Sequence, residues 1–462
     1  MKKKNVVFVL TDDQRFNTIH ALGNPDIITP NIDWLVGNGT SFTHAHIPCG
    51  TSGAVCMPSR AMLNTGRTLF HLQGEGQIIP EDHTTMGQAF REMGYNCYGT
   101  GKWHNGPAAF TRSFDGGDNI FFGGMWDHWN VPVNHYDATG EYDNVINFVV
   151  NYSLSNKVQK VHCDKFHPGV HSSALLTDTA VEYLNTRNRE DEDPFFLYLA
   201  YLAPHDPRTM PQKYKDMYDP EKITLPENCM AEHPFLFGVE NIRDERLAPY
   251  PRTREELKRQ LAEYYGMITH LDDELGRVLD TLRQRDLLED TLIVFAADNG
   301  LGMGSHGLMG KQNHYEESIR VPLVFCGPGI PRNQKCHNYV YLLDIFPTLC
   351  ELMGRDIPAS VEGKSFAAMF ADPQAVTRDS LYFAYNDMLR SVKKDEWKLI
   401  IYRNTAHEVQ LFNLQEDPLE LHNLAEKKPE KVQELTALLL EYRKTWEDTA
   451  HRYSENFWAD HT

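Results

Sequence analysis

The sequence lacks three features that would each assign it to a common class of protein. No apolar run approaches the ~20 residues of a membrane-spanning helix; the longest, FFLYLAYLA at 195–203, has the length of a strand. The cysteines show neither a CxxC pair nor a metal-knuckle spacing, which argues against a zinc module. Basic residues are outnumbered 64 to 45 by acidic ones, and the formal charge of −19 disfavours nucleic acid or an acidic membrane as partner. A small anion in a locally basic pocket remains compatible with this balance.

The rest of the composition is that of a globular protein, 41% hydrophobic and 24% charged, without internal repeats. A chain of 462 residues exceeds one simple core, so we expect a catalytic domain at 1–375 and a C-terminal subdomain at 376–462. The opening MKKKNVVFVLTDD starts like a secretion leader but reaches two aspartates without a cleavage site, so NVVFVL is interpreted as a core strand. Two locations stay open: the cytoplasm, or the periplasm or exterior if a leader preceded residue 1.

Strand-like runs alternate with amphipathic helical stretches through most of the chain. The runs are NVVFVL (5–10), YNCYGT (95–100), FFLYLAYL (195–202), TLIVFAA (291–297) and VPLVFCG (321–327). The alternation predicts an α/β fold with a large, mostly parallel central sheet and helices on both faces.

Two segments depart from this alternation. Residues 105–172 are rich in glycine, aromatic and turn residues, and are interpreted as an insertion over one end of the sheet. From about residue 378, the short pieces SLYFAY, WKLIIY and VQLFNL precede the helical stretch EKVQELTALLLEYRKTWEDTA. This order predicts a small antiparallel sheet with one helix.

Polar residues of the kind that bind ligands follow four of the predicted core strands. They are Asp12 and Asp13 after the first, Lys102 and His104 after the second, His205 after the third, and Asp298 and Asn299 after the fourth. The carboxyl ends of parallel strands meet at one edge of a sheet, where ligands bind. Each residue alone has a structural reading as a cap or turn residue, but four such endings together predict an active site.

The residue types indicate a metal ion beside a cationic pocket. Carboxylate and amide oxygens are hard donors that suit Ca²⁺ or Mg²⁺ rather than zinc. Three converging carboxylates without a cation would repel one another and raise their pKa values. The cationic candidates are Arg60, Lys102, His104, His205 and Lys311, which suit a tetrahedral oxyanion. A metal and cations around a nucleophile are typical of an ester hydrolase acting on phosphate or sulfate.

The stretch CMPSRAMLNTGR at 56–67 supplies the candidate nucleophile. It fits the pattern Cys-x-Pro-Ser-Arg-x-x-x-x-Thr-Gly-Arg and closely resembles the signature of type I sulfatases of the alkaline-phosphatase superfamily. The resemblance covers nearly the whole chain, because six further stretches occur in the family's order. They are NVVFVLTDDQR, GTGKWH, APHDP, FAADNG, HGLMGKQNHYEESIRVPLV and LFNLQEDPLELHNLA. Cys49 lies nearby but lacks the Pro-x-Arg context.

The resemblance implies an alkaline-phosphatase-like fold and a cysteine oxidised after translation to Cα-formylglycine. A formylglycine-generating enzyme or an anaerobic sulfatase-maturating enzyme would modify Cys56, whose hydrated aldehyde would be the nucleophile. The metal, commonly Ca²⁺ with Mg²⁺ as alternative, would be bound by Asp12, Asp13, modified Cys56, Asp298 and Asn299. Arg60 would hold the formylglycine in place, and Lys102 and Lys311 would bind the sulfate. His205 would protonate the leaving oxygen, and His104 would be the base that releases sulfate.

The insertion at 105–172 is the expected specificity element. Its phrase FFGGMWDH resembles bacterial carbohydrate sulfatases, which implies a sulfated saccharide as substrate. The candidate sugar-binding residues are Arg112, Trp126, Asp127 and His128. Trp126 and Trp129 are equally compatible with packing inside the insertion.

Three other functions stay open. A phosphonate monoester hydrolase or phosphodiesterase of the same superfamily also uses formylglycine, but more often has glycine at the position of Ser59. An arylsulfatase or choline-sulfatase would act on a small molecule. A catalytically inactive binding protein would keep Cys56 as a thiol and turn over no substrate. The sugar, the sulfate position, exo or endo action, oligomeric state and disulfide pairing are not specified by the sequence.

Overall fold

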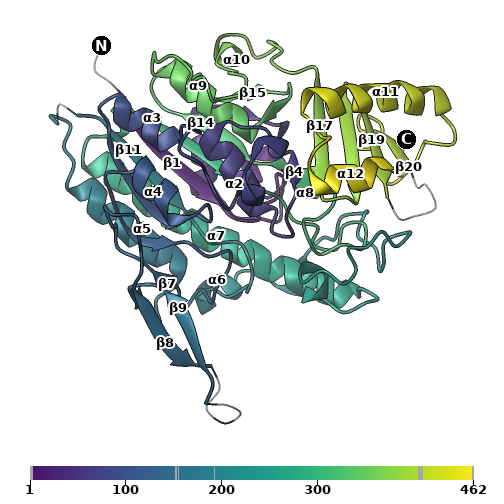
Figure 1. Ribbon diagram of the computed structural model, residues 1–462. Helices are drawn as coiled ribbons and strands as arrows, with labels where there is room; N and C mark the ends of the chain where they lie inside the picture. Colours follow the sequence, from purple (N-terminus) through teal and green to yellow (C-terminus); the bar gives the residue numbers. More distant parts are fainter. Residues whose placement is uncertain (1–3, 151–152, 154–155, 192, 404–408, 460–462) are drawn as a thin grey trace.

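The computed structural model describes residues 4–150, 153, 156–191, 193–403 and 409–459 (Figure 1). At its centre lies β1 (Asn5–Thr11), in which every residue is buried. Successive side chains of a strand point to opposite faces, and here both faces are covered: Val7 and Val9 belong to one apolar core, and Val6, Phe8 and Leu10 to another. This double burial explains the unbroken apolar run at 5–10.

The central sheet has eight strands in the order β15-β2-β14-β12-β1-β11-β5-β6. β1 runs parallel to both neighbours, and the parallel run continues through β5 to β6. The bounds are β11 (Phe195–Ala200), β12 (Thr291–Ala297), β5 (Asn96–Lys102), β6 (Gly116–Phe121), β14 (Leu323–Cys326), β2 (Gly39–Phe42) and β15 (Gln334–Cys336). β14 pairs antiparallel with both β12 and β2. The prediction of a large, mostly parallel sheet is confirmed, and the run at 321–327 proves to enter it in the reverse direction.

Helices cover both faces of the sheet. The face of Val7 and Val9 packs against α1 (Pro30–Asn38), α5 (Ser172–Asn185) and the long α7 (Arg254–Gln284). The opposite face packs against α2 (Cys56–Thr65), α3 (Met86–Glu92), α4 (Pro107–Ser113) and α9 (Ile345–Leu352).

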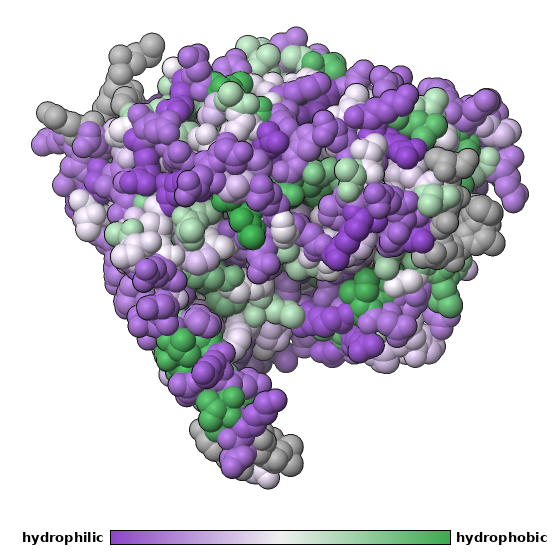
Figure 2. Space-filling view, in the orientation of Figure 1, coloured by the Kyte–Doolittle hydropathy of each residue, from purple (hydrophilic) through white to green (hydrophobic). Residues whose placement is uncertain are grey.

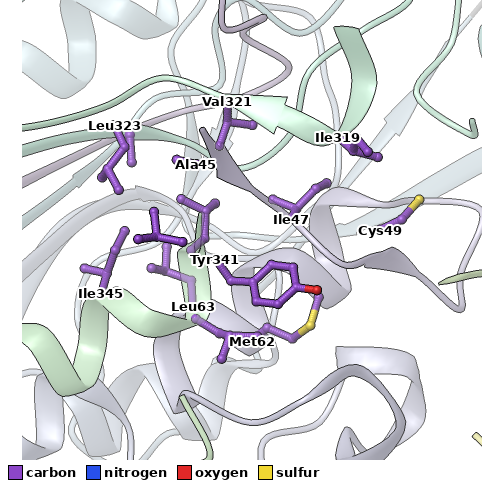
Figure 3. Packing of buried hydrophobic residues seen from close by; sticks show 14 of the residues in the cluster. Ala45, Ile47, Cys49, Met62, Leu63, Ile319, Val321, Leu323, Tyr341 and Ile345 are labelled. Carbon is purple, nitrogen blue, oxygen red and sulfur yellow. The ribbon is translucent and has the colours of Figure 1, made fainter. Parts of the chain in front are cut away.

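Helix α2 is fixed deep in the second core. Met62 and Leu63 lie among Ile47, Tyr341 and Ile345, which come from three other segments of the chain (Figure 3). The helix ends at Gly66, whose left-handed φ of 64° allows its N–H to donate to the Met62 carbonyl. Because its apolar side is held so firmly, the first residue of α2 has a defined position at the sheet edge.

Residues 105–172 divide into a part built into the main sheet and a projecting part. α4 and β6 complete the central layers, whereas β8 (Val145–Val149) and β9 (Val158–His162) form a hairpin that extends from the body (Figure 1). The short β7 (Pro132–Val133) and β10 (Lys165–Phe166) pair near its base. Figure 2 shows hydrophobic residues on this projection, in agreement with the exposed Val145 and Val158.

The C-terminal subdomain has the predicted antiparallel sheet and helix. The strands β17 (Ser380–Tyr385), β18 (Leu389–Lys394), β19 (Trp397–Tyr402) and β20 (Val409–Asn413) form a meander. The two C-terminal helices are α11 (Pro429–Thr445) and α12 (Arg452–Ala459). A fifth strand, β4 (Cys49–Gly50), joins β17 in parallel from the segment just before α2. The subdomain therefore contacts the polypeptide that leads to Cys56, and the boundary at 375 stays a prediction.

The remaining short elements connect these layers. They are β3 (Ala45–His46), β13 (Arg320–Val321) and β16 (Val340–Tyr341), which form a small sheet, and α6 (Gln212–Lys215), α8 (Glu316–Ile319) and α10 (Ala368–Ala371). Within the described ranges, no helix combines the length and the apolar character that crossing a membrane requires.

A buried ion pair joins the C-terminal elements. Arg390 on β18 donates to both oxygens of Asp448, at 2.6 and 3.1 Å, and neither side chain is exposed. The same carboxylate accepts from Tyr382 on β17 and from Trp458 on α12. Asp448 thus links two strands and the last helix.

We expect Asp448→Ala to lower the free energy of unfolding by about 3–5 kcal/mol, because Arg390 would remain buried without a counter-charge. Urea unfolding followed by circular dichroism measures the change. Glu434→Ala is the control, since Glu434 pairs with Lys431 on the exposed side of α11 and should cost less than about 1 kcal/mol. Equal effects of the two substitutions would contradict this view of the ion pair.

Candidate active site

The strand ends bring the predicted site residues of β1, β11 and β12 side by side. The Asp12 N–H donates to the Ala203 carbonyl after β11 at 3.1 Å. The Asp298 N–H after β12 donates to the Thr11 carbonyl at 3.0 Å. The register of the central strands therefore fixes where the acidic side chains meet.

The buried acidic groups fit a hard divalent cation. Asp12, Cys56 and Asp298 offer ligand atoms that lie within 4.8 Å of one another. Asp12 Oδ1 and Asn299 Oδ1 are buried without a hydrogen-bond partner among the described residues. A buried acceptor without a donor is costly, and a cation would satisfy both oxygens. Asp13 adjoins them, since its Oδ1 accepts from Asn299 Nδ2 at 2.7 Å.

The carboxylates also differ in their electrostatic surroundings. Burial and the neighbouring charge of Asp12 raise the pKa of Asp298 to about 6. Burial alone would raise the pKa of Asp13 too, but the charges of His205 and Lys311 outweigh it and hold that pKa well below its ordinary value. The surroundings therefore favour the charged form of Asp13 and disfavour the charged form of Asp298, which lies beside Cys56.

Three buried cations surround these groups. Lys102 Nζ bonds the Asp12 carboxylate, Lys311 Nζ lies 2.5 Å from Asp13 Oδ1, and Arg60 Nε lies 2.7 Å from Asp298 Oδ2. Burial by itself would lower the pKa of each lysine, but the adjacent carboxylates raise it above the ordinary value. Both lysines are therefore charged at neutral pH.

Cys56 begins α2 and is almost completely buried beside these cations. Its Sγ lies 3.5 Å from both Lys102 Nζ and His104 Nδ1. Burial raises the pKa of the Cys56 thiol, despite the opposing charges of Lys102 and Lys311. The side chain is therefore a protonated thiol at neutral pH, which is a poor nucleophile.

A cavity of about 260 Å³ opens over Cys56 and is also lined by His104, His205 and Lys311. Burial and the charge of Lys102 hold the pKa of His104 well below its ordinary value, so the ring is neutral and able to accept a proton. His205 Nδ1 lies 2.8 Å from the Asp206 carbonyl, which accepts the ring proton. His104 and Asp13 have φ angles of 72° and 63°, a strained region for such residues that is common at functional sites.

None of the four predicted sugar-binding residues lines this cavity. Trp126 packs against the rings of Phe148 and Phe166. This agrees with the alternative that Trp126 packs inside the insertion. Asp127 is exposed and accepts from the Trp129 N–H at 3.0 Å. Arg112 donates to the carbonyls of residues 79, 80 and 83.

His128 is buried with both ring nitrogens engaged. Its Nδ1 lies 2.7 Å from Ser172 Oγ and its Nε2 lies 2.9 Å from the His205 carbonyl. The side chain therefore holds the backbone of His205 instead of facing a ligand.

Sequence reasoning missed the other residues of the cavity. They are Gly53, Ala54, Gly124, Met125, Ile242, Arg243, Asp244 and Gln312. Met125 directly precedes Trp126, one of the predicted sugar-binding residues, and Gln312 directly follows Lys311. Residues 242–244 come from an irregular segment without periodicity or motif, so the sequence held no signal for them.

Comparisons with known proteins identify two family models that match this chain. The sulfatase family model matches residues 4–355, and the model of the N-sulphoglucosamine sulphohydrolase C-terminal region matches residues 304–445. An arylsulfatase of Clostridium perfringens (strain 13 / Type A) is 28% identical over 95% of this chain and 94% of its own length.

Two solved structures show the same fold, which confirms the predicted alkaline-phosphatase-like architecture. One is a protein in complex with its substrate D-glucosamine-2-N,6-O-disulfate, with a TM-score of 0.79 at 20% identity, covering 97% of this chain and 99% of that one. The other is a phosphonate monoester hydrolase of Agrobacterium radiobacter, with a TM-score of 0.73 at 22% identity, covering 96% of both chains.

Since His128 acts on the site through His205, we expect His128→Ala to lower kcat by roughly 10- to 100-fold on every substrate alike, because the ring of His205 would shift. Steady-state kinetics with one synthetic aryl ester and one natural ester measures this. His135→Ala is the matched control, because the His135 side chain is 57% exposed. A loss confined to the natural substrate would instead make His128 a specificity residue.

Proposed function

The chain belongs to the sulfatase family, and on that premise we propose that it releases inorganic sulfate from a sulfated carbohydrate, using an aldehyde made from Cys56 and a divalent cation, Ca²⁺ before Mg²⁺. One observation carries the proposal. Cys56 lies at the base of a cavity between two charged lysines and two histidines, above buried oxygens that lack a donor. This arrangement suits a tetrahedral dianion whose ester oxygen must be protonated as it leaves.

Residue 56 needs modification to serve as the nucleophile, because its thiol is protonated and has no route for releasing sulfate. A hydrated aldehyde at residue 56 would supply two hydroxyl groups on one carbon. One would serve as the nucleophile, and loss of the proton from the other would let the carbon–oxygen bond to sulfate break and the aldehyde re-form. Cys56, Pro58 and Arg60 are all buried, so a maturating enzyme that reads the Cys-x-Pro-x-Arg core would act before the chain has folded.

The cation would be held by Asp12, Asp13, residue 56, Asp298 and Asn299. When bound, it supplies a Lewis acid that polarises the sulfate oxygens and stabilises the developing charge. The donor set is composed of hard oxygens, which suits Ca²⁺ or Mg²⁺.

The polar side chains around residue 56 then have roles consistent with their surroundings. Lys102 and Lys311 remain charged and lie where they can bind sulfate oxygens. His205 donates its Nδ1 proton to the Asp206 carbonyl and has its Nε2 3.6 Å from Asp13 Oδ2, so Nε2 is the ring nitrogen that would deliver a proton to the leaving oxygen. Neutral His104 accepts a proton beside residue 56. Arg60 donates to Asp298 and to the Lys102 carbonyl, and so links the ends of β12 and β5.

A phosphonate monoester hydrolase is the second candidate, favoured by the structural likeness to such an enzyme. Its substrate is also a tetrahedral oxyanion. Ser59, interpreted above as leaning toward sulfate, donates its hydroxyl proton to the Asp298 carbonyl at 2.5 Å and is buried. It supports the metal-binding loop and does not contact a substrate directly, so the choice between the two esters needs an experiment.

Sulfate release from a panel of sulfated mono- and oligosaccharides tests the proposal. The protein must first be shown by mass spectrometry to carry formylglycine at residue 56. Aryl sulfates, choline sulfate, a phosphonate monoester and a phosphodiester complete the panel. We expect the highest kcat/KM on a sulfated sugar. A preference for a phosphorus ester would overturn the assignment and leave the fold and nucleophile standing.

Removal of the cation should lower both activity and stability, because the buried carboxylates would repel one another. Adding Ca²⁺ to chelator-treated protein at 100 times Kd should raise the free energy of unfolding by about 2.7 kcal/mol. Urea unfolding with and without Ca²⁺ measures this independently of turnover. Unchanged stability together with unchanged activity would contradict the metal site.

Cys56→Ala should lower kcat by ~10⁴-fold or more, because the nucleophile is lost while the supporting groups remain. The substitution is small and local, so the circular dichroism spectrum should stay close to that of the unaltered protein. Cys49→Ala is the matched control, a buried cysteine on β4 that should leave turnover within a few-fold. Substantial activity in Cys56→Ala would refute the nucleophile.

A further inference from the structure

An ion pair in the wall of the cavity is used by none of the steps above. Arg243 NH1 donates to Asp206 Oδ1 at 2.7 Å, and NH2 bonds the other oxygen of the same carboxylate. Both Arg243 and His205 line the cavity, and Asp206 directly follows His205. The pair therefore lies next to the group assigned to the leaving oxygen.

We propose that Arg243, held in place by Asp206, binds neighbouring hydroxyl groups of the sugar that carries the sulfate, and so selects carbohydrate over aryl esters. This inference rests on the proposed function and deepens it.

The guanidinium retains donors for a ligand. Arginine has five N–H donors, and the contacts that the described residues make with Arg243 use three of them: two with Asp206 and one with Asp244. Its side chain is 44% exposed, so the remaining two donors are accessible.

The two remaining N–H donors of Arg243 match a pair of adjacent hydroxyl groups, each of which both donates and accepts. A phenyl ring has neither function. A second anionic group fits less well, because Asp206 and Asp244 already neutralise the charge of Arg243. Met125 and Ile242, which also line the cavity, offer apolar contact to the C–H groups of a sugar ring.

The pair is connected to the sulfate-binding side of the cavity. Asp244 accepts from Arg243 NH1 at 3.3 Å and from Gln312 Nε2 at 2.7 Å. Gln312 follows Lys311 in the chain. These bonds fix the guanidinium relative to the lysine that would hold the sulfate, which positions the hydroxyl contacts at a set distance from the reacting ester.

The test compares Arg243→Ala with the unaltered enzyme, both carrying formylglycine. The substrates are the best sugar sulfate of the panel, its analogue lacking the hydroxyl next to the sulfated carbon, 4-nitrophenyl sulfate and phenyl sulfate. We expect kcat/KM on the sugar to fall about 10- to 100-fold, and on both aryl sulfates to stay within about twofold. The missing hydroxyl should cost the unaltered enzyme a similar factor, and should cost Arg243→Ala little.

Two further variants keep the test decisive. Arg246→Ala removes an exposed arginine of the short helix Asp244–Leu247, which begins directly after Arg243, and should change the activity on neither kind of substrate. Arg243→Lys keeps the charge without the two-pronged geometry, and should lose most of the sugar activity while folding normally.

Equal losses on sugar and aryl sulfates would overturn the inference, and so would a loss that grows from 4-nitrophenyl to phenyl sulfate, because Arg243 would then act only through His205. Unaltered enzyme that hydrolyses aryl or phosphorus esters but no sugar sulfate would overturn the proposed function as well. The three failures are therefore distinguishable.

Discussion

Three carboxylates buried at the ends of adjacent strands are the constraint on which the site depends. Asp12, Asp13 and Asp298 would destabilise the fold if their charges were not balanced. Two lysines and one arginine bond them directly, yet Asp12 Oδ1 keeps no partner among the described residues. A divalent cation would supply the partner that this oxygen lacks. The same charges surround residue 56, so the groups that stabilise the folded chain are also those that would bind the sulfate.

The position of residue 56 depends on packing far from the chemistry. Helix α2 is held on its apolar side by Met62 and Leu63 (Figure 3), and β4 just before it is paired with the C-terminal sheet. The C-terminal subdomain of this sulfatase, itself closed by the Arg390–Asp448 pair, thus supports the segment that leads to residue 56.

Much of the fold and the polar centre of the site could be predicted from the sequence because each had a local signal. Buried parallel strands give apolar runs, and the ligand-type residues directly follow those runs. The direction of β14 was not predictable, since an apolar run does not indicate whether its strand lies parallel or antiparallel to its neighbours. The imidazole of His128 suggested a sugar-binding role, but its burial is a property of the packed insertion. Arg243 lies in an irregular segment and reaches the cavity only through the tertiary fold, so no local pattern indicated it.

The most direct measurement is the rate of sulfate release against the fraction of chains that carry an aldehyde at residue 56. Preparations with different degrees of maturation provide the series, mass spectrometry of the residue 56 peptide gives the fraction, and one sugar sulfate serves throughout. The account predicts a straight line through the origin, because a buried, protonated thiol cannot replace the hydrated aldehyde. A finite rate at zero aldehyde would contradict it, since the site would then work with another nucleophile.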